Sequence, residues 1–157
     1  MSENTIESDH YFRLMADASS VLIWTIDANG LSSFYNKTFL DFIGVSAEED
    51  ISDWQKIVHP DDIDATFDTI NTATSERKPY SLECRMLRAD KKWRWVLAQG
   101  NPLLDKNNNF LGFVGSSIDI TERKEAETKI EASETSFRNL VEQAPVAMVY
   151  FEEVILY

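Results

Sequence analysis

Hydrophobic and polar positions along the chain alternate in five short runs, which we interpret as β-strands. In the clearest run, Leu82, Cys84 and Met86 share one face, and the residues between them are polar or charged. The first two runs are separated by Asp27-Ala28-Asn29-Gly30, which is typical of a tight hairpin turn. The predicted strands cover residues 21–26, 31–35, 80–88, 93–99 and 110–118.

Between the second and third predicted strands, hydrophobic residues recur at helical spacing instead. A short helix capped by Asn36 and ended by Gly44 is expected first. Helical turns follow over residues 46–58, and a longer helix begins at Pro60 and ends near Thr74. The expected buried residues of these helices are Phe39, Leu40, Phe42, Ile43, Trp54, Ile57, Ile63, Phe67 and Ile70.

The order of elements defines a fold class. An amphipathic helix over residues 10–18, with Tyr11, Leu14 and Met15 on its apolar face, precedes two strands, several helices, three strands and a last helix. This order predicts an α+β fold: a five-stranded antiparallel sheet with a helical cover on one face. Residues 1–9 are polar and acidic, and we expect them to be disordered or a frayed helix start.

The last strand leads into the last helix with almost no intervening residues. Asp119 can accept hydrogen bonds from the first backbone amides of the helix, and Glu122 can complete a capping box. We predict that Asp119, Ile120, Thr121 and Glu122 form a mechanical junction between the sheet and the helix.

Residues 120–142 form a predicted linker helix with a weak heptad pattern. One heptad position is occupied by Arg123, Ile130 and Phe137, and the other by Ala126, Ser133 and Leu140. A solvated single helix and a parallel two-chain coiled coil both fit this pattern. A homodimer through the N-terminal and linker helices is the expected assembly.

The end of the chain resembles its beginning. The run that starts Phe137-Arg138 aligns with the run that starts Phe12-Arg13, and Val146 then falls opposite Val21. We interpret residues 143–157 as the truncated start of a second copy of the domain formed by residues 10–119.

Composition excludes several functional classes. The net charge of −12 argues against binding to nucleic acid or to an anionic membrane surface. A single cysteine, Cys84, allows no internal disulfide bond, and no apolar run approaches the roughly 20 residues of a membrane span. We expect this segment to be cytoplasmic, although its parent protein could be anchored in a membrane elsewhere.

Three stretches of the sequence resemble the PAS family of sensory domains with a PAC-type C-terminal half. They are IVHPDD at residues 57–62, the run from Tyr80 to Asp105, and GFVGSSIDITERK at residues 112–124. The resemblance implies a dimeric sensory domain upstream of an output domain such as a histidine kinase or a diguanylate cyclase or phosphodiesterase. It also implies that Asp119-Ile120-Thr121 is the junction to a signalling helix.

No arrangement of residues in the sequence indicates catalysis or a metal site. His59, the one histidine inside the domain, precedes Pro60-Asp61-Asp62, where a hydrogen bond at a helix start explains it better than ligation of haem. Cys84 lies in a strand, unlike the cysteine of flavin-based light sensors of this family. We therefore expect no cofactor, while a haem or flavin sensor stays open as an alternative.

A small molecule could bind between the helices and the sheet, but a filled hydrophobic core is the competing interpretation. Few polar side chains are expected to point inward, and a ligand site usually has some. A ligand-free interaction domain is therefore an alternative to a ligand sensor. The candidate pocket residues are Phe39, Phe42, Ile43, Trp54, Phe67, Ile70, Leu82, Cys84 and Met86.

Overall fold

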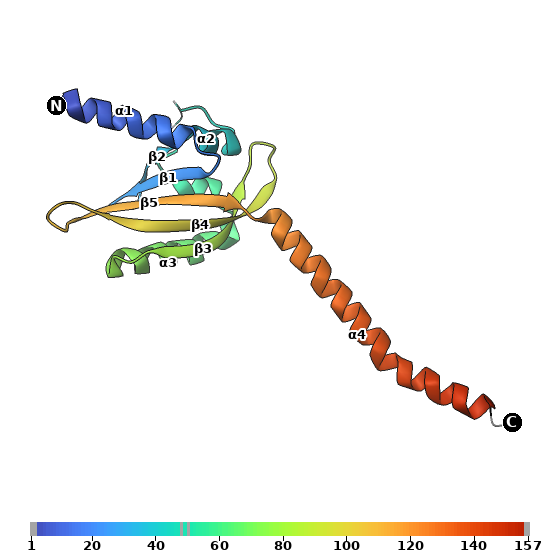
Figure 1. Ribbon diagram of the computed structural model, residues 1–157. Coiled ribbons are helices and arrows are strands. Elements are labelled where there is room, and N and C mark those ends of the chain that lie inside the picture. Colours follow the sequence, from blue (N-terminus) through green and yellow to red (C-terminus); the bar gives the residue numbers. More distant parts are fainter. Residues whose placement is uncertain (1–2, 48, 50, 156–157) are drawn as a thin grey trace. The chain divides into compact units, whose positions relative to one another are not determined.

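A computed structural model describes residues 3–47, 49 and 51–155 and contains a five-stranded antiparallel sheet, as predicted (Figure 1). The spatial order of the strands is β2-β1-β5-β4-β3, so the first and last strands of the chain pair in the middle of the sheet. The elements are α1 (Glu3–Asp17), β1 (Leu22–Asp27), β2 (Ser32–Tyr35), α2 (Lys37–Ile43), the 3-10 helices η1 (Trp54–Ile57) and η2 (Pro60–Asp62), α3 (Ile63–Glu76), β3 (Tyr80–Leu87), β4 (Trp93–Leu104), β5 (Phe110–Asp119) and α4 (Thr121–Ile155).

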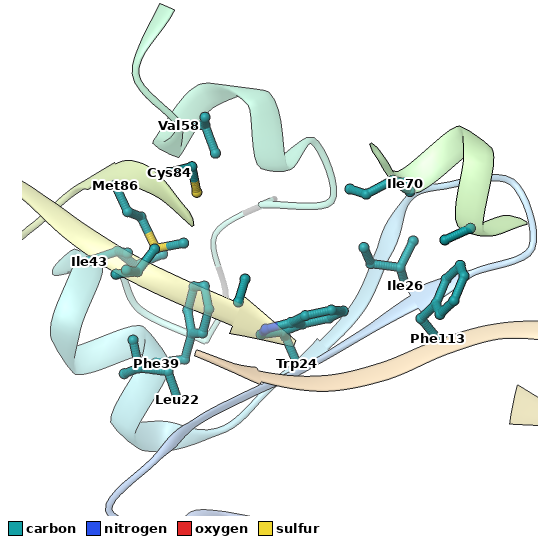
Figure 2. Close-up of a cluster of buried hydrophobic side chains, with 13 residues drawn as sticks. Leu22, Trp24, Ile26, Phe39, Ile43, Val58, Ile70, Cys84, Met86 and Phe113 are labelled. Atoms are coloured by element: carbon teal, nitrogen blue, oxygen red, sulfur yellow. The ribbon is translucent and has the colours of Figure 1, made fainter. Parts of the chain in front are cut away.

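The hydrophobic core lies between the inner face of the sheet and the helices α2 and α3, with the segment that joins them (Figure 2). Strand alternation places Leu22, Trp24 and Ile26 of β1 in this core, and helical spacing adds Phe39 and Ile43 from α2. The remaining buried hydrophobic residues of the core are Val58, Ile70, Ala73, Cys84, Met86, Val96, Ala98 and Phe113.

The side chain of Asn36 connects three elements at one end of the sheet. Its Oδ1 atom accepts hydrogen bonds from the backbone amides of Ile23 in β1, at 2.9 Å, and Phe39 in α2, at 3.0 Å. Its Nδ2 atom donates to the carbonyl oxygens of Ala16 in α1, at 2.8 Å, and Val21, at 2.9 Å. Asn36 is completely buried, so these bonds satisfy polar groups that water cannot reach.

The N-terminal helix α1 differs from its predicted form. The first helix begins at Glu3 rather than near residue 10, so residues 3–9, expected to be disordered or a frayed helix start, are part of the helix. Its predicted apolar face, Tyr11, Leu14 and Met15, is exposed, and Ala16 is buried. The helix contacts the domain near its C-terminal end, where the Phe12 ring packs against Phe34 of β2 with the ring centroids 5.4 Å apart.

The C-terminal segment is a single helix. Helix α4 continues from Thr121 to Ile155, through the region where the start of a second domain copy is predicted, and residues 156–157 lie outside the described residues. A second copy is therefore not confirmed. An apolar segment without neighbouring strands has no partner for a β-ladder, and the helix satisfies its backbone groups locally.

We predict that replacing Asn36 lowers the free energy of unfolding strongly, because it removes four hydrogen bonds from two backbone amides and two carbonyl oxygens. Asn36→Ala should cost about 3–5 kcal/mol in chemical denaturation. Asn36→Asp should also destabilise the fold, since it turns a donor group facing two carbonyl oxygens into an acceptor. Asn71→Ala on the exposed side of α3 is the control, and an equal effect at both positions would contradict this assignment.

Candidate functional site

A cavity of about 60 Å³ lies between the sheet and the helices. Six of the nine predicted pocket residues line it, and they come from α2, η1, α3 and β3. These six are Phe39, Trp54, Ile70, Leu82, Cys84 and Met86.

The other three predicted pocket residues lie elsewhere. Ile43 is buried in the core but does not line the cavity, and Phe42 packs against the core from its side. Phe67 is about half exposed, at 48%, because α3 turns Thr66 and Ile70 toward the sheet instead. The sequence does not decide whether Thr66 or Phe67 faces the sheet, because they lie three and four residues after Ile63 and both spacings fit one face of a helix.

The sheet supplies cavity residues that the sequence did not mark, notably Trp24, Tyr80 and Ser117. Trp24 lies on the inner face of β1 and is buried in the core. Its position inside the cavity depends on strand pairing across the whole sheet, which local patterns do not reveal. The alternation of Leu22, Trp24 and Ile26 was the one available signal.

Two pairs of polar side chains around the cavity bond to each other. The indole Nε1 of Trp24 donates to Ser117 Oγ at 3.0 Å, and both side chains are buried. The hydroxyl of Tyr35 donates to Ser32 Oγ at 2.7 Å. Groups already paired in this way do not present an open hydrogen-bonding site to a ligand.

Burial also keeps Cys84 and Tyr80, two of the titratable groups of the cavity, neutral. It raises the pKa of the Cys84 thiol to about 12, and the negative charge of Asp62 adds to this effect, while a hydrogen bond with Thr66 opposes it. Burial likewise raises the pKa of Tyr80, with a smaller contribution from Cys84. A protonated thiol is a poor nucleophile, so this cavity is not suited to covalent chemistry.

The cavity is smaller than a typical cofactor pocket. Cofactor and ligand pockets usually enclose about 300–1,000 Å³, several times the volume found here. His59 does not line the cavity, and its Nδ1 atom accepts a hydrogen bond from the backbone amide of Asp61 at 3.1 Å. This helix-start hydrogen bond is the role that the sequence predicted for His59. Among the described residues, no group of three or more His, Cys, Asp or Glu side chains could hold a metal ion.

The predicted junction residues lie at the end of β5 and the start of α4. Asp119 is the last residue of β5, and its Oδ2 atom accepts a hydrogen bond from Arg94 Nε of β4 at 2.8 Å. The amide of Ile120 donates to the carbonyl oxygen of Trp95 at 2.8 Å. Helix α4 then begins at Thr121, and Glu122 is an exposed acidic residue in its first turn. A negative charge at this position favours the helix start.

A second ion pair holds the segment before α3 against the edge of the sheet. Asp62 accepts two hydrogen bonds from the Arg85 guanidinium, at 2.9 and 2.7 Å, and one from the Arg85 backbone amide at 2.8 Å. Arg85 holds the pKa of Asp62 below the ordinary carboxyl value. This pair thus holds the η2 segment against β3. The cavity residue Val58, which lies just before η2, forms a β-bridge with Met86 of β3.

The sheet order, the helical cover and the junction together define a sensory domain of the PAS type. A sequence profile described as "PAS fold" matches residues 32–117, and the chain belongs to this family.

Similar proteins agree with this assignment. The uncharacterized protein y4lL of Sinorhizobium fredii is 38% identical over 128 residues, which cover 81% of this chain and 16% of that protein. The peroxide stress-activated histidine kinase mak1 of Schizosaccharomyces pombe is 26% identical, with coverage of 85% and 8%. A sensory box histidine kinase/response regulator structure from Burkholderia thailandensis shares the fold at a TM-score of 0.64 and 22% identity, covering 82% of this chain and 98% of that one.

The chain spans between 8% and 21% of the length of the curated relatives that it matches. It therefore corresponds to one module of much longer proteins. None of the described helices has the length and apolar character needed to cross a lipid bilayer.

We predict that Asp62→Asn lowers the free energy of unfolding by about 1–3 kcal/mol at neutral pH, since it removes a charged partner of Arg85. Because folding lowers the pKa of Asp62, its stabilising effect is present above the unfolded pKa and is lost as the pH falls through the folded pKa. The difference between wild type and variant, measured by urea denaturation, should therefore shrink in acid. Asp41→Asn, in the exposed Lys37–Asp41 pair, is the control and should change stability little.

Proposed function

We propose that this chain is a sensory and dimerisation module that passes a signal through the junction Asp119–Glu122 into α4. The observation that carries the proposal is the ion pair between Arg94 and Asp119, which joins neighbouring strands directly before the helix. Both side chains are largely buried, with exposed fractions of 20% and 26%. Such a pair is screened less by water than a surface pair.

The contacts at the junction are well placed to transmit a change in the sheet. Arg94 and Trp95 are consecutive residues of β4, and they bind Asp119 and Ile120, respectively, by a side-chain and a backbone interaction. Trp95 also lies opposite Arg85 of β3, which carries the Asp62 pair. A shift of β3 or β4 would thus move the residue from which the helix starts.

The small cavity favours a partner protein as the source of the signal over a ligand or cofactor within the core. A ligand-free interaction domain is the second candidate function, and the paired polar groups of the cavity support it. A haem or flavin sensor is not supported, for the reasons of volume and His59 geometry given above.

The output domain lies outside this chain. The names of the relatives from Schizosaccharomyces pombe and Burkholderia thailandensis support a histidine kinase, and a diguanylate cyclase or phosphodiesterase is the other candidate. We propose that the module lies in the cytoplasm, together with the output enzyme that its signal would have to reach. The parent protein itself could be anchored in a membrane.

Exposed apolar residues on two helices support a homodimer. On α4, Ile130, Phe137 and Leu140 are more than half exposed, at 58%, 68% and 67%, and they occupy the predicted heptad positions. On α1, Tyr11 and Met15 are similarly exposed. We therefore propose a parallel dimer in which both helices contact a second copy.

We predict that charge reversal in the Arg94–Asp119 pair distinguishes a role in signal relay from a role in stability alone. In the full-length parent protein, Arg94→Asp and Asp119→Arg should each abolish the change in output that the stimulus normally causes. The double variant, in which the opposite charges face each other again, should regain at least part of that response. The measurement is output activity with and without stimulus, and Arg88→Asp in the exposed hairpin pair is the control.

Equal loss in both single variants and in the double variant would leave the relay unsupported if all three remained folded. An unchanged response in the single variants would contradict the relay directly. Denaturation curves of the three isolated chains distinguish these outcomes from unfolding.

We also predict that Ile130→Glu combined with Phe137→Glu converts a dimer into a monomer, because each change puts a charge into the heptad seam. Sedimentation equilibrium measures the association directly. Thr135→Glu lies on the opposite side of the heptad pattern and should leave the dimer intact. A monomeric wild-type chain at micromolar concentrations would instead support a solvated single helix.

A further inference from the structure

Four residues lie in one row across the inner face of the sheet, one on each of four neighbouring strands. Trp24 of β1 pairs with Gly115 of β5, Gly115 pairs with Gly100 of β4, and Gly100 pairs with Tyr80 of β3. The two outer positions carry large aromatic rings, and the two central positions carry no side chain.

The rings occupy the space that the two glycines leave open. A Cβ atom on Gly100 would lie 2.5 Å from Cε1 of Tyr80 and 3.1 Å from Cη2 of Trp24, and one on Gly115 would collide with the Trp24 indole. The two rings are stacked, with centroids 6.2 Å apart and an interplanar angle of 27°. Figure 2 shows the Trp24 side chain extended through the middle of the buried cluster.

The indole is also held in a specific orientation. Its N–H group donates to Ser117 Oγ at 3.0 Å, and Trp24 and Ser117 are both buried. A flat surface of two glycines and one buried hydrogen-bond acceptor are features expected of a site for a planar aromatic molecule. In this chain a side chain of the protein fills that site.

We propose that Trp24 determines what the core can accept: its indole occupies the position of a planar aromatic ligand and limits the remaining cavity to about 60 Å³. Without the indole, the glycine pair and Ser117 form a binding site for a planar aromatic molecule with one N–H donor. This inference does not depend on the signal relay, because it concerns the interior of the core alone.

The test is Trp24→Ala in the full chain, with free indole as the probe. Indole should raise the thermal unfolding midpoint of the variant, by an amount that grows with the logarithm of indole concentration, and should leave wild type unchanged. Ile43→Ala is the matched control, because it removes a buried side chain of the same core that does not line the cavity. Equal stabilisation of Ile43→Ala or of wild type by indole would overturn the proposal, as would a folded Trp24→Ala that indole does not stabilise.

The role of Ser117 gives a second, independent measurement. Indene has the shape of indole but lacks the N–H group, so Trp24→Ala should bind indole about 2- to 10-fold more tightly than indene. Adding Ser117→Ala should bring the ratio close to one. A ratio that Ser117→Ala does not change would contradict the assigned orientation.

Trp24→Ala alone could fail to fold, since it removes a large buried side chain. Refolding it in the presence of saturating indole then becomes the measurement, and recovery of the native circular dichroism spectrum only with indole supports the proposal. If neither condition gives folded protein, Trp24→Val, which keeps a β-branched side chain in the strand and frees the space of an aromatic ring, replaces it with benzene as the probe. A folded Trp24→Val that benzene does not stabilise would count against the site.

Discussion

The four hydrogen bonds of the buried Asn36 side chain are the interaction on which the arrangement of the N-terminal half depends. They join the end of α1, the start of β1 and the start of α2. Because an unpaired amide or carbonyl in this position would be shielded from water, the geometry is strongly specified. It places β1 in the middle of the sheet, and β1 carries the tryptophan that fills the core.

Trp24 determines how much space is left in the hydrophobic core. The row from Trp24 to Tyr80 combines two large rings with Gly115 and Gly100, so that the rings lie flat on the sheet where ordinary side chains would stand. The remaining cavity is small, its polar groups are paired, and burial keeps the Cys84 thiol and the Tyr80 hydroxyl neutral. These properties favour recognition by surface contacts over chemistry or cofactor binding inside the domain.

The end of the sheet at which the chain enters α4 also carries contacts of a different kind. There the contacts are charged: Asp62 with Arg85, and Asp119 with Arg94, on neighbouring strands and close to the exit of the chain into α4. Ion pairs at such a position can be broken and re-formed at modest cost compared with repacking a core. A domain whose core is filled, and whose connection to α4 is held by charged side chains, is suited to transmitting small shifts of its strands to that helix.

The sequence alone determined those elements whose signals are local: the alternation around Cys84, the Asp27–Gly30 turn, the Asn36 cap and the direct passage from Asp119 to Thr121. Six of the nine residues predicted for the pocket line the cavity, where helical or strand periodicity was unambiguous. Tertiary structure alone decided the rest. Phe67 lies outside because the orientation of α3 on the sheet selected Thr66, and Trp24 meets Gly115, Gly100 and Tyr80 only through the register of four strands. Register pairs residues far apart in the chain, and no local pattern of one strand specifies which residue of another will lie beside it.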